Sequence, residues 1–118
     1  MEIGNIKFKA KKTLDGKLIK GDLVHHKDSD NVWITDYENQ LTSPVNPSTV
    51  CQFTGLKDTN DVPIFEGDII AFDGKGEVVF KDGAFYAKFG KYTECLLCNL
   101  VKSGISVTIV GNKFDKEK

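Results

Sequence analysis

The residues with the most potential for chemistry are two cysteines in a C-x-x-C arrangement, Cys95 and Cys98. In an intracellular protein this spacing occurs in redox pairs and in halves of zinc sites. A tetrahedral site needs four ligands, and Cys51 with His25 or His26 would complete one only if distant strands converged. Free cysteine usually packs as a small buried hydrophobe. We therefore expect packing, with no metal and no disulfide, and keep zinc and redox chemistry as the alternatives.

Two carboxylates, Glu66 and Asp68, stand two residues apart, as a pair on one strand face would. Such a pair can bind a hard cation or exchange protons. Because both flank Gly67, the simpler interpretation is a turn in which Asp68 accepts backbone hydrogen bonds. The neighbours His25 and His26 would point to opposite faces of a strand, and no nucleophile accompanies them. The sequence thus predicts no catalytic residue, no cofactor site and no metal site, and the protein is not expected to be an enzyme.

The charge composition argues against sequence-specific DNA recognition. Sixteen basic residues oppose seventeen acidic ones, the net charge is -1, and every basic residue is lysine. Arginine is the usual bidentate reader of guanine, so its absence weakens that function class. No apolar run approaches the roughly 20 residues of a membrane span, and the amino terminus lacks the apolar segment of a signal peptide. A cytoplasmic protein without a membrane partner is expected.

Hydrophobic alternation and turn residues predict a chain of short strands. The expected strands are 6–11, 17–25, 32–35, 52–54, 62–65, 69–72, 77–81, 84–89 and 105–110. Pro63 lacks an N–H and fits an edge or a strand start, and Asp82-Gly83 predicts a type I′ hairpin turn. Residues 39–47 are expected to form a loop, followed by one helical turn with Asn46 as N-cap and Pro47 at the first helical position. For 92–102 a short helix is preferred over a buried strand.

Several of these segments carry a family resemblance. The run F-T-G-L-K-D-x-N-x-x-x-I-F-E-G-D-I-I begins at Phe53, the run G-E-V-V-F-x-D-G-A-F begins at Gly76, and the tail V-x-x-V-G-N-x-F begins at Val107. Together they resemble the YopX family of small bacteriophage and prophage proteins. One departure is Asn60-Asp61, where such proteins often have Asn-Gly. The resemblance implies a compact, mostly β protein of mobile-element origin, and it supplies no catalytic residues.

The expected architecture is a single all-β domain over 1–118 with at most one or two short helices. Residues 1–50 would form a small antiparallel unit, packed on an SH3-like or related small barrel over 51–114, and 115–118 would fray. A small β protein of this kind leaves strand edges that must be guarded or paired. We therefore expect self-assembly through the 53–65 hairpin or through an exposed strand of the amino-terminal unit.

The predicted function is that of a non-enzymatic phage or prophage accessory protein that acts by protein binding or self-assembly. Its partner would be a second copy of the chain, or a host or phage protein. The predicted interaction surface consists of Phe53, Pro63, Phe65 and Tyr86. The alternative is a weak single-stranded nucleic-acid-binding β-barrel, because aromatic residues interleaved with lysines are typical of a base-stacking platform. These residues are Phe80, Phe85, Tyr86 and Phe89, with Lys81 and Lys88.

Overall fold

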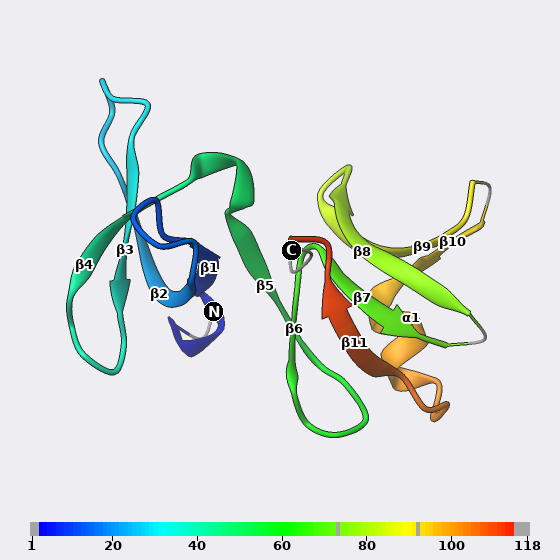
Figure 1. Ribbon diagram of the computed structural model, residues 1–118. Helices are drawn as coiled ribbons and strands as arrows, with labels where there is room; N and C mark the ends of the chain where they lie inside the picture. The colour runs from blue at the N-terminus through cyan, green and yellow to red at the C-terminus, as the bar shows by residue number, and fades with distance from the viewer. Residues whose placement is uncertain (1–2, 73, 92, 115–118) are drawn as a thin grey trace. The chain divides into compact units, whose positions relative to one another are not determined.

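The computed structural model describes residues 3–72, 74–91 and 93–114 (Figure 1). These residues form eleven strands, one α-helix, α1 (Leu97–Lys102), and two short 3-10 helices, η1 (Ile3–Asn5) and η2 (Pro47–Thr49). The predicted all-β class is confirmed. The chain divides into two compact units, Met1–Phe53 and Thr54–Lys118. The tail 115–118, expected to fray, lies outside the described residues.

The amino-terminal unit is an antiparallel sheet. It contains β1 (Phe8–Lys11), β2 (Leu18–His25), β3 (Val32–Asp36) and β4 (Thr42–Val45), in the order β4-β3-β2-β1. The start of β5 (Cys51–Lys57) pairs with the free side of β1. An isolated bridge between Lys12 and Val45 joins the end of β1 to β4, so the first and fourth strands also meet. The core of this unit is made of Ala10, Ile19, Val32, Ile34 and Val45.

Strand β4 corrects the loop predicted for 39–47. Pro44 lies opposite Trp33 in the pairing with β3, and its carbonyl accepts the Thr13 N–H at 3.1 Å. Proline is tolerated here because β4 is the last strand in its order and needs no further donor from that residue. The helical turn that follows is confirmed: Asn46 caps η2 by accepting the Ser48 N–H at 3.1 Å, and Pro47 is its first residue.

The carboxy-terminal unit contains a second antiparallel sheet. Its strands are β7 (Asp68–Ala71), β8 (Lys75–Lys81), β9 (Ala84–Phe89), β10 (Thr93–Leu96) and β11 (Thr108–Asn112), in the order β10-β9-β8-β7-β11. The rest of β5 pairs with β6 (Pro63–Phe65). In place of the expected barrel, the described part of this sheet is open, with β10 and β11 at its two ends. The core contains Ile64, Ile70, Val78, Ala87, Leu97, Leu100 and Val107.

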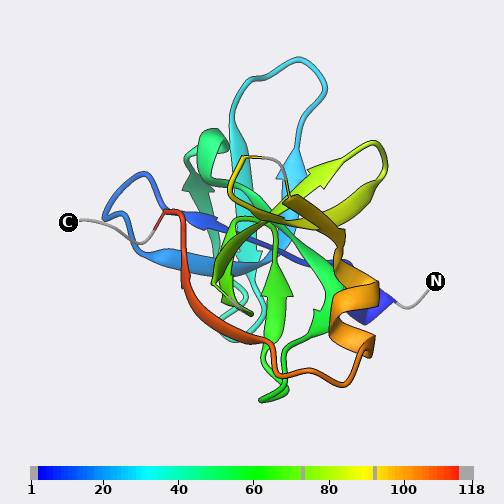
Figure 2. The same cartoon turned by 90° about the vertical axis from the view of Figure 1, so that its right-hand side faces the viewer.

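The helix α1 follows β10 and lies beside this sheet (Figure 2). Its Leu97 and Leu100 are buried in the core of the unit. The segment 92–102 is thus a strand followed by a helix, since β10 occupies 93–96; Tyr92 lies outside the described residues. Residues 105–107 are not part of β11, which corrects the strand predicted for 105–110. Both backbone groups of Val107 are bonded to Thr59 instead, its N–H to Thr59 Oγ1 at 2.7 Å and its carbonyl to the Thr59 N–H at 2.8 Å.

In two turns the backbone conformation explains which residue types occupy them. Asp82 and Gly83 both have positive φ, 52° and 83°, as the predicted type I′ turn requires, and β8 and β9 pair on either side of it. Asp61 also has a positive φ, 68°. This is the position where the resemblance would place glycine, and aspartate is one of the few other residues that adopt this conformation at modest cost.

Candidate functional site

The three cysteines remain free thiols. Cys51 is buried and its S–H donates to the Thr49 carbonyl at 3.4 Å, whereas Cys95 and Cys98 are half-buried. Cys95 lies in β10 and Cys98 in α1. Among the described residues, no group of three or more His, Cys, Asp and Glu side chains is placed to hold a metal ion. These thiols therefore offer no ligand set from which a function can be argued.

Asp68 is an internal brace. Its side chain is 2% exposed; Oδ2 accepts the Phe65 N–H at 2.7 Å and Oδ1 accepts an Asn112 Nδ2–H at 2.9 Å. The first bond is the local turn contact predicted for this residue. The second ties the Glu66-Gly67-Asp68 turn to β11, 44 residues further along the chain. A buried carboxylate used in this way holds two chain segments together instead of facing a substrate.

Asp58 has the same role at the loop between β5 and β6. Its Oδ1 accepts the N–H groups of Asn60 at 2.8 Å and Val62 at 2.9 Å, and its Oδ2 accepts the Ile109 N–H at 3.1 Å. The Asp58 side chain is buried. The loop is therefore closed on itself and fastened to β11. The sequence did not identify this role of Asp58, because a contact to a residue 51 positions away leaves no local signal.

The predicted interaction surface is only partly available. Phe53 is 4% exposed and Phe65 1% exposed, so both are core side chains. This corrects their assignment to a contact surface. Phe53 lies on the buried face of β5, whereas β6 is buried on both faces at Ile64 and Phe65, and alternation alone does not identify which faces are covered. Pro63 and Tyr86 are half-buried and retain accessible surface.

Tyr86 lies on the sheet face opposite the core. Its cross-strand neighbours are Val79 on β8 and Leu96 on β10, and cross-strand neighbours share a face. We call these three half-buried side chains, Val79, Tyr86 and Leu96, the apolar row. Charged residues border it: Lys81 Nζ lies 2.7 Å from Glu94 Oε1 and 5.5 Å from the Tyr86 ring centroid. The hydrogen bond to Glu94 is the main cause that raises the pKa of Lys81.

Four other aromatic residues of this unit lie on the opposite face. Phe80 and Phe85 are paired, with ring centroids 4.9 Å apart, and Phe72 and Phe89 lie 6.1 Å apart. Tyr86 points away from both pairs, because successive residues of a strand face opposite sides of the sheet. The aromatic set is thus divided between two faces and does not form one continuous stacking platform.

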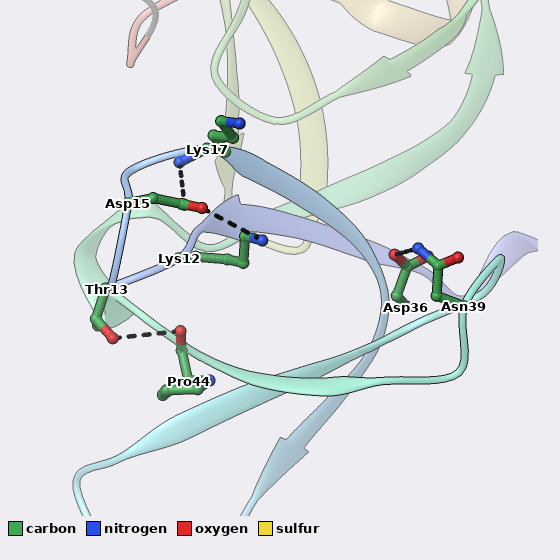
Figure 3. Close-up of polar contacts among 7 residues, drawn as sticks. All are labelled: Lys12, Thr13, Asp15, Lys17, Asp36, Asn39 and Pro44. Atoms are coloured by element: carbon green, nitrogen blue, oxygen red, sulfur yellow. Dashed lines mark hydrogen bonds and ion pairs between the residues drawn. The ribbon is translucent and has the colours of Figure 1, made fainter.

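The amino-terminal unit contains a polar hollow that the sequence did not suggest. Its volume is about 380 Å³ and its lining residues are Lys12, Leu18, Ile19, Lys20, Asp36, Tyr37 and Glu38. Near it, Lys12 Nζ lies 3.5 Å from Asp15 Oδ2, and Asp36 Oδ2 accepts a hydrogen bond from Asn39 Nδ2 at 3.2 Å (Figure 3). At the rim, Lys12 is thus paired with a carboxylate, and Asp36 accepts from a neutral amide. The hollow is formed where β2 packs against the turn after β3. This packing is a tertiary contact, so no local sequence pattern predicts the hollow.

Among the residues that line the hollow, Tyr37 has a shifted pKa. Its hydroxyl lies 3.1 Å from Asp22 Oδ1 and 3.3 Å from the Ile6 carbonyl. Desolvation, followed by the hydrogen bond and charge of Asp22, raises the pKa of Tyr37 above its ordinary 10.0. A tyrosine held in its neutral form is a hydrogen-bonding group, not a base at neutral pH.

The histidines do not join either region. His25 and His26 are both exposed, and the His26 ring packs edge-on to Trp33 with centroids 5.2 Å apart. This is the placement expected of a solvated strand end. No helix within the described ranges is long and apolar enough to cross a bilayer.

Comparison with known proteins places these features in a family. The family model described as YopX protein matches residues 7–117. The crystal structure of protein EF1440 from Enterococcus faecalis superimposes with a TM-score of 0.58 at 23% identity, covering 91% of this chain and 92% of that one. At this identity the likeness concerns the fold alone. No curated protein sequence matches the chain. Because the family model matches nearly the whole length, the chain belongs to the YopX family.

Proposed function

We propose that this protein is a non-enzymatic phage or prophage accessory protein that acts by binding another protein or by self-assembly. The observation that carries the proposal is the apolar row Val79, Tyr86 and Leu96 on the sheet face away from the core. A tyrosine between aliphatic neighbours, with charged groups around it, has the composition of a protein interface with a polar rim. Tyrosine is also among the residues that most often dominate binding energy.

The carboxylates of the family signature support the same proposal. Asp58 and Asp68 are the buried acidic side chains of the described residues, and both accept backbone or amide hydrogen bonds inside the fold. A general acid or base must be within hydrogen-bond reach of a substrate. The oxygens of both residues are directed into the unit. Their presence in the family signature is therefore explained by their contribution to the stability of the fold.

The test is a pull-down from induced bacterial cells with a matched pair of variants. In Tyr86→Ser the centre of the apolar row is lost, whereas in Tyr37→Ser an exposed tyrosine of the other unit is lost. We expect the wild type and Tyr37→Ser to retain the same partner, or to assemble with themselves above 13.1 kDa in sedimentation equilibrium. Tyr86→Ser should lose that association by tenfold or more in affinity, about 1.4 kcal/mol or above.

Two results would contradict the proposal. One is a species fixed at 13.1 kDa up to high micromolar concentration together with no retained protein. The other is a partner that is bound equally by the wild type and Tyr86→Ser, which would move the interface away from the apolar row. Circular dichroism of both variants establishes that each retains the fold.

A further inference from the structure

The open end of the five-stranded sheet at β10 is suited to pairing with a second copy of the chain. We infer that the outer edge of β10 pairs antiparallel with β10 of the second copy, with Cys95 opposite Cys95 of that copy. This inference rests on the proposed function, because it specifies the partner and the route of self-assembly. It also moves the predicted assembly edge from the 53–65 hairpin and the amino-terminal unit to β10.

The other strand ends are guarded in ways that β10 is not. On β4, Pro44 interrupts the edge, and its carbonyl is already bonded to the Thr13 N–H. Strand β6 begins with Pro63. Proline and existing partners are among the devices by which β proteins prevent edge-to-edge association.

The opposite end of the same sheet is guarded as well. Strand β11 has a register irregularity between Ile109 and Gly111. Lys113 is the first residue after the end of this strand. A bulge twists an edge away from a partner, and a lysine places a charge on it. By contrast β10, Thr-Glu-Cys-Leu, contains no proline, glycine or lysine and pairs with β9 in an unbroken register. Of the described strand ends, β10 is the one without a proline, a bulge or a lysine.

The symmetry of a two-stranded pairing limits the possible registers. In a symmetric antiparallel pair, a two-fold axis perpendicular to the sheet leaves the same face of both sheets on the same side. Cross-strand neighbours share a face, so the central residue of the paired strand must lie opposite the same residue of the second copy. Within β10 this residue is Glu94 or Cys95 if three residues of each strand are to pair. Centring on Glu94 would place two carboxylates opposite each other, which is destabilising. Centring on Cys95 places Glu94 opposite Leu96 of the second copy.

The charge at this edge is already compensated. Lys81 Nζ lies 2.7 Å from Glu94 Oε1, so each copy brings a neutralised carboxylate to the pairing. With Cys95 at the centre, the face that carries the apolar row would continue into the second copy. On the other face, Cys95 and Thr93 line a hollow of about 260 Å³ with Phe72 and Phe89, which leaves room beside the thiol. Electrostatics and space thus both favour this register.

Cross-strand neighbours have Cβ atoms roughly 4.5–5.5 Å apart, close to the separation in a disulfide. Oxidation with diamide therefore tests the register directly. Two Cys95 thiols would form one S–S bond and transfer two electrons and two protons to diamide, which is reduced to the hydrazine. The variant used is Cys51→Ser/Cys98→Ser, which keeps Cys95 alone, and the matched control is Cys51→Ser/Cys95→Ser, which keeps Cys98 alone.

We expect the Cys95 variant to run at twice the 13.1 kDa chain mass on a non-reducing gel, and the Cys98 variant to remain at 13.1 kDa. Equal crosslinking of the two variants, or no crosslinking of Cys95, would overturn the inferred register. If Cys95 does not crosslink while Tyr86→Ser still loses its partner, the edge pairing is wrong and the protein-binding function stands.

A second pair of variants tests the pairing without oxidation. Leu96→Lys would place a cation opposite Glu94 of the second copy, whereas Leu96→Glu would place two anions there; both lose the same apolar side chain. We expect sedimentation equilibrium to give a dimer about tenfold weaker for Leu96→Glu than for Leu96→Lys, because like charges directly opposite are destabilising. Equal dissociation constants for the two folded variants would contradict the inference.

Discussion

Asp68 shows how one carboxylate connects distant parts of the carboxy-terminal unit. Its two oxygens accept hydrogen bonds from the Phe65 backbone and the Asn112 amide, at 2.7 and 2.9 Å, in a site from which water is nearly excluded. Removing a buried acceptor leaves its donors without partners, and that loss costs more than the net value of the bonds.

We predict that Asp68→Ala lowers the free energy of unfolding by about 3 kcal/mol, because two buried donors lose their acceptor. Urea denaturation followed by circular dichroism measures this change. The control is Glu66→Ala, two residues away and half-buried, which should change stability by no more than about 0.5 kcal/mol. Equal losses for the two variants would show that the two residues act as a pair, against the brace assigned to Asp68.

Tyr37 makes the stability of the amino-terminal unit depend on pH in the alkaline range. Its pKa in the folded protein is raised above 10.0 by desolvation and by Asp22, so the folded state binds the phenolic proton more tightly than the unfolded chain does. The resulting stabilisation is fully present below pH 10 and is lost as the pH rises through the folded pKa.

We predict that Asp22→Asn lowers the pKa of Tyr37, because it removes the carboxylate charge that opposes ionisation. Ultraviolet titration of phenolate absorbance, taken as the difference between each protein and the same protein with Tyr37→Phe, isolates this tyrosine from the others. An unchanged Tyr37 midpoint in Asp22→Asn would contradict the contribution assigned to Asp22.

At the scale of the element, the packing of β8 against β9 requires a glycine at position 76. A Cβ on Gly76 would lie 2.6 Å from the Phe89 ring, closer than carbon atoms approach. Phe89 belongs to the neighbouring strand β9 and packs against the core of its unit. The glycine of the G-E-V-V-F motif therefore makes room for the Phe89 ring of the neighbouring strand.

We predict that Gly76→Ala destabilises the protein by about 2 kcal/mol, because the Phe89 ring must leave its packed position. The control is Gly4→Ala, where a Cβ would meet no atom within 4 Å. Thermal unfolding of both variants measures the difference. A second-site change, Phe89→Leu, should recover part of the loss in Gly76→Ala, and no recovery would argue against the steric explanation.

For the whole molecule, the charge balance and the divided aromatic set favour protein binding over binding of single-stranded nucleic acid. Sixteen lysines face seventeen acidic residues, and the ring pairs Phe80–Phe85 and Phe72–Phe89 lie on the face opposite Tyr86. Binding to a single strand needs a cationic groove with aromatic rings along it, and it weakens steeply with salt.

We therefore predict no salt-dependent retention of the protein on single-stranded DNA at low ionic strength. Chromatography on immobilised oligonucleotide, with a single-strand-binding protein as the positive control, measures this. Retention at 50 mM salt that disappears near 200 mM would instead favour the nucleic-acid-binding alternative, and Phe80→Ala would then identify whether the exposed ring contributes.

The sequence by itself determined the local features of this fold. Strand 84–89, the type I′ turn at Asp82-Gly83 and the Asn46 cap all appear where predicted, because turn chemistry and alternation act over a few residues. The YopX signature also identified the family from residues alone.

Only the tertiary structure decided which residues are available for function. Phe53 and Phe65 were predicted to lie on a contact surface, and they are buried because other elements of the fold cover them. Pro44 lies in a strand because β4 is at the end of its sheet. The bonds from Asp58 to Ile109 and from Asp68 to Asn112 span 51 and 44 residues. Such contacts depend on how the chain closes long loops, and no pattern over neighbouring residues contains that information.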